Sequence, residues 1–216
     1  FHRVCGEYVS QEVIPLLKDV GLWPFPFHTP MIDQVRMTTP TGKAVTEKLD
    51  LGGFGISRYL FDYQFSLKAR EIGASIHEGT KVQGVIYHPE ADYFTVQTHK
   101  GSYDAKLVLG NFGKRSVMDR HLKRAFLGKP SPYIGVKHHI LTDAPANEIA
   151  LHSFPRGYCG LSQVEEGRYS LCYLARREAL KAAGGVQQLE EHYLSHNPSL
   201  RQVFQEATFC WNKPLV

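Results

Sequence analysis

The hydrophobic pattern changes its period along this chain, and that change limits the folds that the chain can adopt. Residues 57–73 place apolar side chains at helical spacing on one face. This face comprises Phe61, Phe65, Ala69 and Ile72. From residue 74 onward, short segments alternate apolar and polar residues with a period of two, which is typical of strands. A long helix followed by strand-rich blocks predicts an α+β fold.

Prolines and a capping serine mark where helices and loops begin in the first part of the chain. Residues 10–20 follow a helical pattern in which Pro15 must lie in the first turn or kink the helix. The segment LWPFPFHTP, residues 22–30, contains three prolines and predicts an aromatic loop. Ser57 is placed to cap the long helix at its N-terminus. Between the aromatic loop and this helix, two strands are expected at 31–38 and 43–49, joined by the turn PTGK.

The strand-like segments form two blocks. The first predicts a strand followed by a three-stranded antiparallel meander, at residues 74–79, 81–88, 93–101 and 103–110. A helix from about Ser116 to Phe126 and a weak domain boundary near 127–131 follow it. The second block is expected at residues 133–141, 148–154, 158–167 and 168–175. Two amphipathic helices close the chain, the second with Asn197 as N-cap and Pro198 at its first position.

Composition and charge exclude several classes of protein. At 216 residues, the chain suits one large domain or two small ones. Its net charge of +4 is spread along the sequence, without the basic run expected of a nucleic-acid-binding protein. No apolar segment approaches the roughly 20 residues that a membrane-spanning helix needs. The four cysteines form no C-x-x-C pair, which favours reduced thiols and a cytoplasmic protein.

Two features could meet an anion. The segment LVLGNFGKRS, residues 107–116, places Gly110 and Gly113 after an expected buried strand. It does not fit the phosphate loop G-x-x-x-x-G-K-[ST], because the glycines are too close and Arg115 holds the hydroxyl position. A strand–turn–helix connection is the simpler interpretation, although the helix N-terminus would still suit an anion. Arg58, in the first turn of the long helix, either contacts an anion or extends along the surface.

Other candidate residues favour structural roles on local evidence. Cys5 has no neighbouring base, and it fits a small buried residue better than a nucleophile. His138 and His139 are adjacent on an expected strand, so their rings point to opposite faces and cannot bind one metal ion together. Pro155 and Tyr158 begin a hairpin that suits a tight bend or the edge of a pocket. No pattern identifies a catalytic acid, base or nucleophile.

Four segments are informative when they are taken together and in order. They are RVCGEYVS, GISRYLFDYQFSLKAREIGASIHEGTKVQGV, LVLGNFGKRS and FPRGYCGLSQVEEGRYSLCYL. Their order resembles the geranylgeranyl-reductase branch of the flavin-dependent oxidoreductases, which share the fold of p-hydroxybenzoate hydroxylase. The resemblance implies an incomplete FAD/NAD(P)-binding domain with an antiparallel meander, at 1–30 and 50–127. It also implies a mixed-sheet substrate domain with the C-terminal helices, at 31–49 and 128–216.

By this resemblance, several residues would contact the cofactor FAD. The family's Cys-Gly segment lies along the flavin, and it corresponds here to CGEY. Arg58 matches an arginine that contacts FAD, and Val82 falls on the strand that meets the adenine. Gly110, Gly113 and Ser116 match the fingerprint Gly-Ala-Asp-Gly-x-x-Ser, in which Phe112 replaces the aspartate. The implied cofactor contacts are Arg3, Cys5, Gly6, Tyr8, Arg58, Val82, Gly110 and Gly113.

Departures from the family pattern limit what the resemblance implies. The motif P-x-x-Y-x-W-x-F-P of geranylgeranyl reductases keeps Pro155 and Tyr158, which are therefore the implied substrate contacts, but Gly160 replaces its tryptophan. The lysine and tryptophan signature of flavin halogenases is absent, which sets halogenation aside. The chain also contains neither the family's G-x-G-x-x-G motif nor its Gly-Asp segment. It is therefore expected to be an internal fragment that binds FAD weakly or not at all.

The resemblance implies that the full-length protein is an FAD-dependent oxidoreductase driven by NAD(P)H. Its expected activity is reduction or monooxygenation of a small apolar substrate, a class that includes isoprenoids. The alternative is a non-catalytic ligand-binding module that keeps the fold but not the cofactor, and Phe112 favours it. No nucleic-acid or metal partner is expected, while a peripheral contact with a membrane and the oligomeric state stay open.

Overall fold

The computed structural model describes residues 1–113, 116–129 and 131–216, and it divides into two compact units. The sheet unit comprises residues 1–73 and 132–216, and the meander unit comprises residues 74–131. The turn predicted at Lys114 and Arg115, and Pro130 in the predicted boundary, lie outside the described residues. The predicted division into cofactor and substrate domains is a functional one, which these units do not test.

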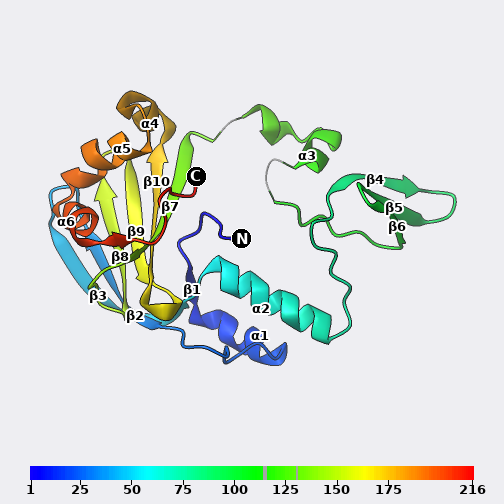
Figure 1. Cartoon of the computed structure of the whole chain (residues 1–216), viewed down its shortest axis with the longest axis horizontal. Helices are drawn as coiled ribbons and strands as arrows, with labels where there is room; N and C mark the ends of the chain where they lie inside the picture. Colours follow the sequence, from blue (N-terminus) through cyan, green and yellow to red (C-terminus); the bar gives the residue numbers. More distant parts are fainter. Residues whose placement is uncertain (114–115, 130) are drawn as a thin grey trace. The chain divides into compact units, whose positions relative to one another are not determined.

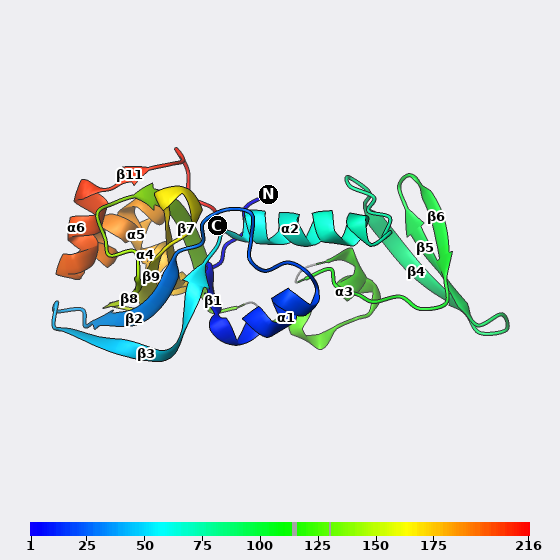
Figure 2. The same ribbon diagram turned by 90° about the horizontal axis from the view of Figure 1, so that it is seen from below.

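An eight-stranded sheet forms the framework of the sheet unit, in the order β1-β3-β2-β8-β9-β10-β7-β11 (Figure 1). The strands are β1 (Tyr8–Ser10), β2 (Met31–Thr38), β3 (Ala44–Gly55), β7 (Tyr133–Leu141), β8 (Glu148–Phe154), β9 (Gly157–Gln163), β10 (Tyr169–Arg176) and β11 (Thr208–Phe209). Neighbouring strands are antiparallel except β2 and β8, which run parallel. β2 and β3 form a long hairpin (Figure 2). The predicted mixed sheet and α+β class are confirmed.

Helices near the C-terminus cover one face of this sheet, which we call the helix face (Figure 1). They are α4 (Arg177–Ala183), α5 (Val186–His192), the 3₁₀ turn η4 (Leu194–His196) and α6 (Pro198–Glu206). Ala179, Leu189 and Leu200 are buried in the same core as Leu171 of β10. The helix predicted before Asn197 is two helices, because the chain leaves α4 at Gly184 with a positive φ of 90°. Asn197 caps α6, as predicted.

A second, aromatic core lies beside α1 (Ile14–Asp19) and α2 (Arg58–Glu71). The short turn η1 (Gln11–Val13) precedes α1, and Pro15 lies in the first turn of α1. Ser57 caps α2, accepting a hydrogen bond from the Leu60 N–H at 3.2 Å, as predicted. The predicted apolar stripe of α2 is buried only in part: Phe61 packs in the core, but Ile72 is 74% exposed. The other aromatic members of this core are Trp23, Phe25, Phe27 and Phe54.

The meander unit contains an antiparallel three-stranded sheet, as predicted. Its strands are β4 (Val82–His88), β5 (Tyr93–Thr98) and β6 (Gly101–Ala105). α3 (Val117–His121) follows with Ser116 and Asp119 as a capping box, and η2 (Ala125–Gly128) ends the unit. Among the described residues, no helix combines the length and apolar character that crossing a membrane requires.

Two strand predictions in this unit are wrong. Residues 74–79 form no strand, and the strand predicted at 103–110 ends at Ala105. Leu107 and Leu109, which were expected to be buried, are 71% and 82% exposed. A strand needs a neighbour to satisfy its main-chain hydrogen bonds, and no described strand pairs with residues 107–110. Their apolar side chains alone therefore do not make a strand.

Candidate functional site

The N-terminal segment, residues 3–8, lies across the face of the large sheet opposite the helix face, which we call the open face. Three of its carbonyl oxygens accept hydrogen bonds from side chains of the large sheet. The Lys137 ammonium donates to the Arg3 carbonyl at 3.2 Å. The hydroxyls of Ser170 and Ser162 donate to the carbonyls of Cys5 and Gly6, each at 3.3 Å. The segment is therefore fixed to the sheet through its carbonyl side.

The N–H groups of the same segment are available to donate hydrogen bonds to solvent or a ligand. Within the part of the chain that the structure describes, the main-chain N–H groups of Val4, Cys5 and Gly6 donate no hydrogen bond. Val4 and Gly6 are exposed and Cys5 is half-buried, so these donors can meet solvent or a ligand. Consecutive donors of this kind suit the acceptor atoms of a bound molecule.

A buried ion-pair network anchors the segment at Glu7. Its side chain is fully buried and accepts hydrogen bonds from the Lys137 ammonium, from His139 Nε2 at 2.6 Å and from the Arg58 N–H at 2.7 Å. Lys137 and His139 are also fully buried. Glu7 holds a positive φ of 61°, a strained conformation for a non-glycine residue. Three donors on one carboxylate explain how this conformation is kept.

Opposing effects act on the pKa of the Glu7 carboxylate. Burial alone would raise the pKa of Glu7, but the hydrogen bond from His139 and the charge of Lys137 lower it overall. The carboxylate is therefore ionised at neutral pH. The ligand atoms of His2, Glu7 and His139 lie within 4.8 Å of one another. Because an ammonium group already shares the Glu7 carboxylate, this cluster is an ion-pair network rather than a metal site.

Sequence reasoning identified neither Glu7 nor Lys137 as important. The two residues are 130 positions apart, and no local pattern joins them. One signal was present: Lys137 and His139 alternate with Val136, His138 and Ile140, so one face of an otherwise apolar strand is polar. The prediction that the two histidine rings point to opposite faces is confirmed, since His138 bonds Glu190 of α5 instead.

The two arginines of the predicted cofactor set are brought together. Asp62, one turn along α2 from Arg58, accepts from the Arg58 guanidinium at 2.9 Å and from Arg3 Nε at 3.3 Å. The Arg58 side chain is 38% exposed, so it neither points away into solvent nor is buried. Both arginines therefore present cationic groups at the N-terminus of α2.

A pocket of about 360 Å³ lies between the N-terminal segment and the open face of β8, β9 and β10. Cys5, Gly6 and Tyr8 from the predicted cofactor set line it, together with Tyr158 from the predicted substrate pair. Pro155, in the turn before β9, does not line it. The apolar lining includes Val4, Ile149, Leu151 and Leu174.

Two small residues shape the floor of this pocket. A Cβ atom built on Gly160 would make ordinary van der Waals contacts at 3.7 Å, with the Cys172 carbonyl oxygen and a Leu151 methyl group. Cys172 lies opposite Gly160 in the sheet register. Burial, reinforced by the neighbouring Cys5, raises the pKa of the Cys172 thiol to about 12, so this thiol is not a nucleophile at neutral pH. The pocket can therefore hold an apolar group but offers no reactive thiolate from Cys172.

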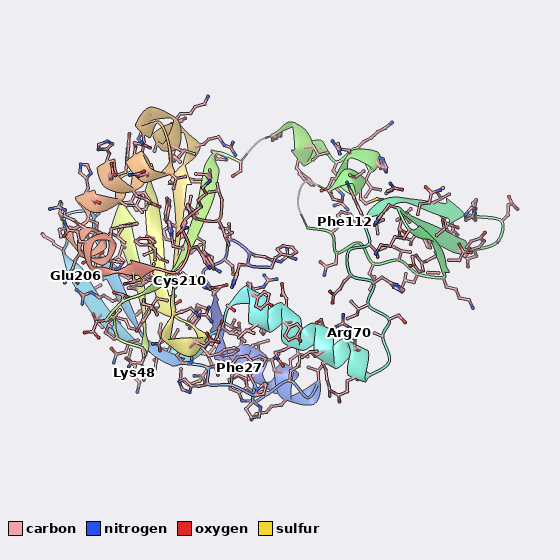
Figure 3. The ribbon with its side chains drawn as sticks, in the orientation of Figure 1. Phe27, Lys48, Arg70, Phe112, Glu206 and Cys210 are labelled. Atoms are coloured by element: carbon pink, nitrogen blue, oxygen red, sulfur yellow. The ribbon has the colours of Figure 1, made fainter. Side chains whose placement is uncertain are left out.

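The remaining predicted cofactor residues belong to the meander unit. Val82 and Gly110 line one pocket of about 750 Å³, which Phe112 also lines. Phe112 is labelled in Figure 3. Gly113 has a φ of 68°, in the left-handed region that favours glycine, and lines a neighbouring pocket with Gly110. The predicted cofactor contacts thus form two groups, one in each unit.

Comparisons with known proteins agree on the fold. No protein-family model matches the chain, and no curated protein matches it. The flavin-dependent halogenase CmlS has a TM-score of 0.79 at 14% identity, over 100% of this chain and 42% of its own. A flavoprotein/dehydrogenase from Cytophaga hutchinsonii has a TM-score of 0.72 at 14% identity, over 98% of this chain and 56% of its own.

A third solved structure comes from the branch that the sequence resembled. A geranylgeranyl bacteriochlorophyll reductase-like protein from Thermoplasma acidophilum has a TM-score of 0.72 at 15% identity, over 96% of this chain and 54% of its own. The chain thus spans about half the length of these proteins. At these identities the comparisons show a shared fold, and the flavoprotein fold that the resemblance implied is confirmed.

Proposed function

We propose that this chain is part of an FAD-dependent oxidoreductase, in which it supplies a cofactor-contacting segment and the sheet that faces the substrate. One observation carries the proposal. The N-terminal segment is fixed to the sheet by its carbonyls and keeps the N–H groups of Val4, Cys5 and Gly6 free beside a pocket. The fold shared with flavin-dependent enzymes supports it.

The chemistry of these residues fits the cofactor. The flavin ring carries carbonyl oxygens and ring nitrogens that accept hydrogen bonds, which the free N–H groups of the segment can donate. Arg3 and Arg58 would bind anionic or carbonyl groups of the same molecule. Val82, Gly110 and Gly113 would supply further contacts from the meander unit. When bound, FAD supplies hydride or oxygen chemistry, and NAD(P)H would be its reductant.

The pocket on the open face would hold the substrate. Its walls are mainly apolar. From β9, the Ser162 hydroxyl already donates to Gly6, and Tyr158 is the polar side chain that would orient a ligand. We infer a small apolar substrate, which the enzyme either saturates or hydroxylates. Because the chain spans about half of the similar proteins, we also propose that it is a fragment and that activity belongs to the complete protein.

A non-catalytic ligand-binding module is the alternative. Phe112 replaces the aspartate of the family fingerprint, and its ring fills the space beside Gly110, where a Cβ atom would be 2.6 Å away. An apolar ring at this position removes a charge that a cofactor-binding site would use. This alternative predicts that neither the chain nor the complete protein binds FAD.

The role of Arg58 can be tested in the complete protein. The substitution Arg58→Ala is expected to weaken FAD binding by about 10- to 100-fold, because a hydrogen bond to a charged group contributes roughly 1.5–3 kcal/mol. The dissociation constant is measured by quenching of flavin fluorescence. The ion pair of Arg58 with Asp62 is partly exposed, so Arg58→Ala should lower the free energy of unfolding by less than about 1 kcal/mol.

Arg156→Ala is the matched control. Arg156 is also an arginine in an exposed ion pair, with Glu178 at 3.2 Å, but it lies outside the proposed site. Its loss should leave FAD affinity unchanged. An Arg58→Ala variant with wild-type FAD affinity would remove Arg58 from the cofactor site.

A further inference from the structure

A second pocket of the sheet unit lies on its helix face, against α6, and the proposed flavin site does not include it. Its volume is about 260 Å³. In the parallel pairing of β2 and β8, Arg36 lies beside Ala150 and Thr38 lies beside His152. These residues share the helix face, whereas Ile149 and Leu151, one position along, line the pocket on the open face. The two pockets therefore lie on opposite faces of one strand.

Two opposite charges line this second pocket, and neither makes a hydrogen bond or a close ion pair with a described residue. Glu148 is only 9% exposed, and its carboxylate makes no hydrogen bond or ion pair with any described residue. The Arg36 guanidinium is equally without a partner among the described residues. Burial raises the pKa of Glu148, although the charge of Arg36 partly opposes this. Its carboxylate oxygens are not sealed from the pocket, so a ligand there can bond a carboxylate that no described side chain bonds.

A hydrogen-bond network fixes a third polar group in the pocket. The Asn197 amide accepts from the N–H groups of Ser199 and Leu200, so its NH₂ group is the one that donates to Thr38 Oγ1 at 2.7 Å. Among the described residues, His152 Nδ1, 2.8 Å away, is the one acceptor bonded to the Thr38 hydroxyl, which favours donation of the hydroxyl proton to this nitrogen. His152 is left with its proton on Nε2.

The tautomer of His152 makes it a neutral donor. Burial, followed by the charge of Arg36, lowers the pKa of His152 to about 4, so the ring carries no charge at neutral pH. Its Nε2 makes no hydrogen bond with any described residue, yet it is not sealed from the pocket. The N-cap of α6 thus fixes a single N–H donor beside the unpaired Arg36 and Glu148.

We propose that this pocket binds an α-amino acid with an apolar side chain. Its carboxylate would pair with Arg36 and His152 Nε2–H, and its ammonium with Glu148. Asp143 and Glu206 also line the pocket, and they add negative charge that favours an ammonium group. Glu206 is labelled in Figure 3. Ala144, Pro145, Leu161 and Val203 offer apolar contacts to the side chain. The pocket is large enough for a leucine-sized molecule, and this inference does not depend on the proposed flavin site.

The test uses three molecules of one shape on the 216-residue chain. L-leucine carries both charges, 4-methylpentanoate lacks the ammonium, and 3-methylbutylamine lacks the carboxylate. Isothermal titration calorimetry should show saturable binding of L-leucine, and at least about tenfold weaker binding of each analogue, because each loses a charge-assisted hydrogen bond. Equal binding of all three, or no binding of L-leucine, would overturn the proposal.

Two variants locate the binding. Glu148→Gln and Arg36→Met should each weaken L-leucine binding by at least about tenfold. Glu178→Gln, at an exposed carboxylate 73% open to solvent outside the pocket, should not change it. Circular dichroism confirms that each variant is folded. If folded Glu148→Gln and Arg36→Met bind L-leucine as the wild type does, the pocket is not the binding site and the inference is wrong.

Discussion

Replacing Lys137 by methionine is expected to lower the free energy of unfolding of this chain by about 3–5 kcal/mol, as is typical when one partner of a buried ion pair is lost. Lys137 and Glu7 are both fully buried, so the carboxylate left behind cannot reach water. The hydrogen bonds from His139 and the Arg58 N–H would remain. Equilibrium unfolding in urea measures the loss.

A matched substitution separates this effect from the loss of any ion pair. Arg156→Met breaks the exposed pair with Glu178 and should cost less than about 1 kcal/mol. The double variant Glu7→Gln, Lys137→Met removes both charges and should be more stable than Lys137→Met alone. A Lys137→Met variant as stable as the wild type would contradict the assignment of a buried, paired carboxylate.

The same ion pair gives a pH dependence of defined sign. The pKa of Glu7 is lower in the folded chain than in the unfolded chain, so its contribution is fully present above the unfolded pKa. That contribution is lost as the pH falls through the folded pKa. The wild type should therefore lose stability in acid, and a Glu7→Gln variant should lose less over the same range.

Replacing Gly55 by alanine is expected to cost about 4 kcal/mol, near the upper end for single substitutions. A Cβ atom at this position would be 1.7 Å from the Gln163 carbonyl oxygen, so the backbones of β3 and β9 would have to separate. Ser57, the N-cap of α2, lies two residues after Gly55, and Glu165, two residues after Gln163, accepts from the Ser57 N–H at 2.8 Å. The substitution should therefore also displace the start of α2.

Gly6→Ala provides the control for this effect. No atom lies within 4 Å of a Cβ built on Gly6, and its φ is not in the left-handed region. Thermal unfolding should place Gly6→Ala within about 1 kcal/mol of the wild type and Gly55→Ala far below it. Similar midpoints for the two variants would show that the contact at Gly55 does not constrain the fold.

Local signals predicted the elements of this chain well. Asn197 and Ser57 were identified as N-caps because short polar side chains before apolar periodic segments satisfy free N–H groups. The bounds of β2 and β7 were predicted to the residue from alternation and flanking turns. The strand at 103–110 failed because apolar composition gives no information about whether a pairing partner exists.

The candidate site was predictable only in part, because contacts between residues distant in sequence leave no local signal. Cys5, Gly6, Tyr8 and Tyr158 were identified through the family resemblance, and the structure brings them to one pocket. Glu7, which anchors the segment, was missed because its partner Lys137 is distant in sequence. Glu148 and Arg36 were missed as well, since a charge that lines a pocket without a hydrogen bond becomes evident only when its surroundings are known.

The most direct test of the proposed function is a titration with FAD, followed by flavin fluorescence quenching, on this chain and on the complete protein. We expect the complete protein to bind FAD and the 216-residue chain to bind it weakly or not at all. Tight binding by the chain alone would contradict the inference that it is an incomplete flavoprotein. If neither binds FAD, the proposed cofactor contacts are structural turns, and the chain is a ligand-binding module with a flavoprotein fold.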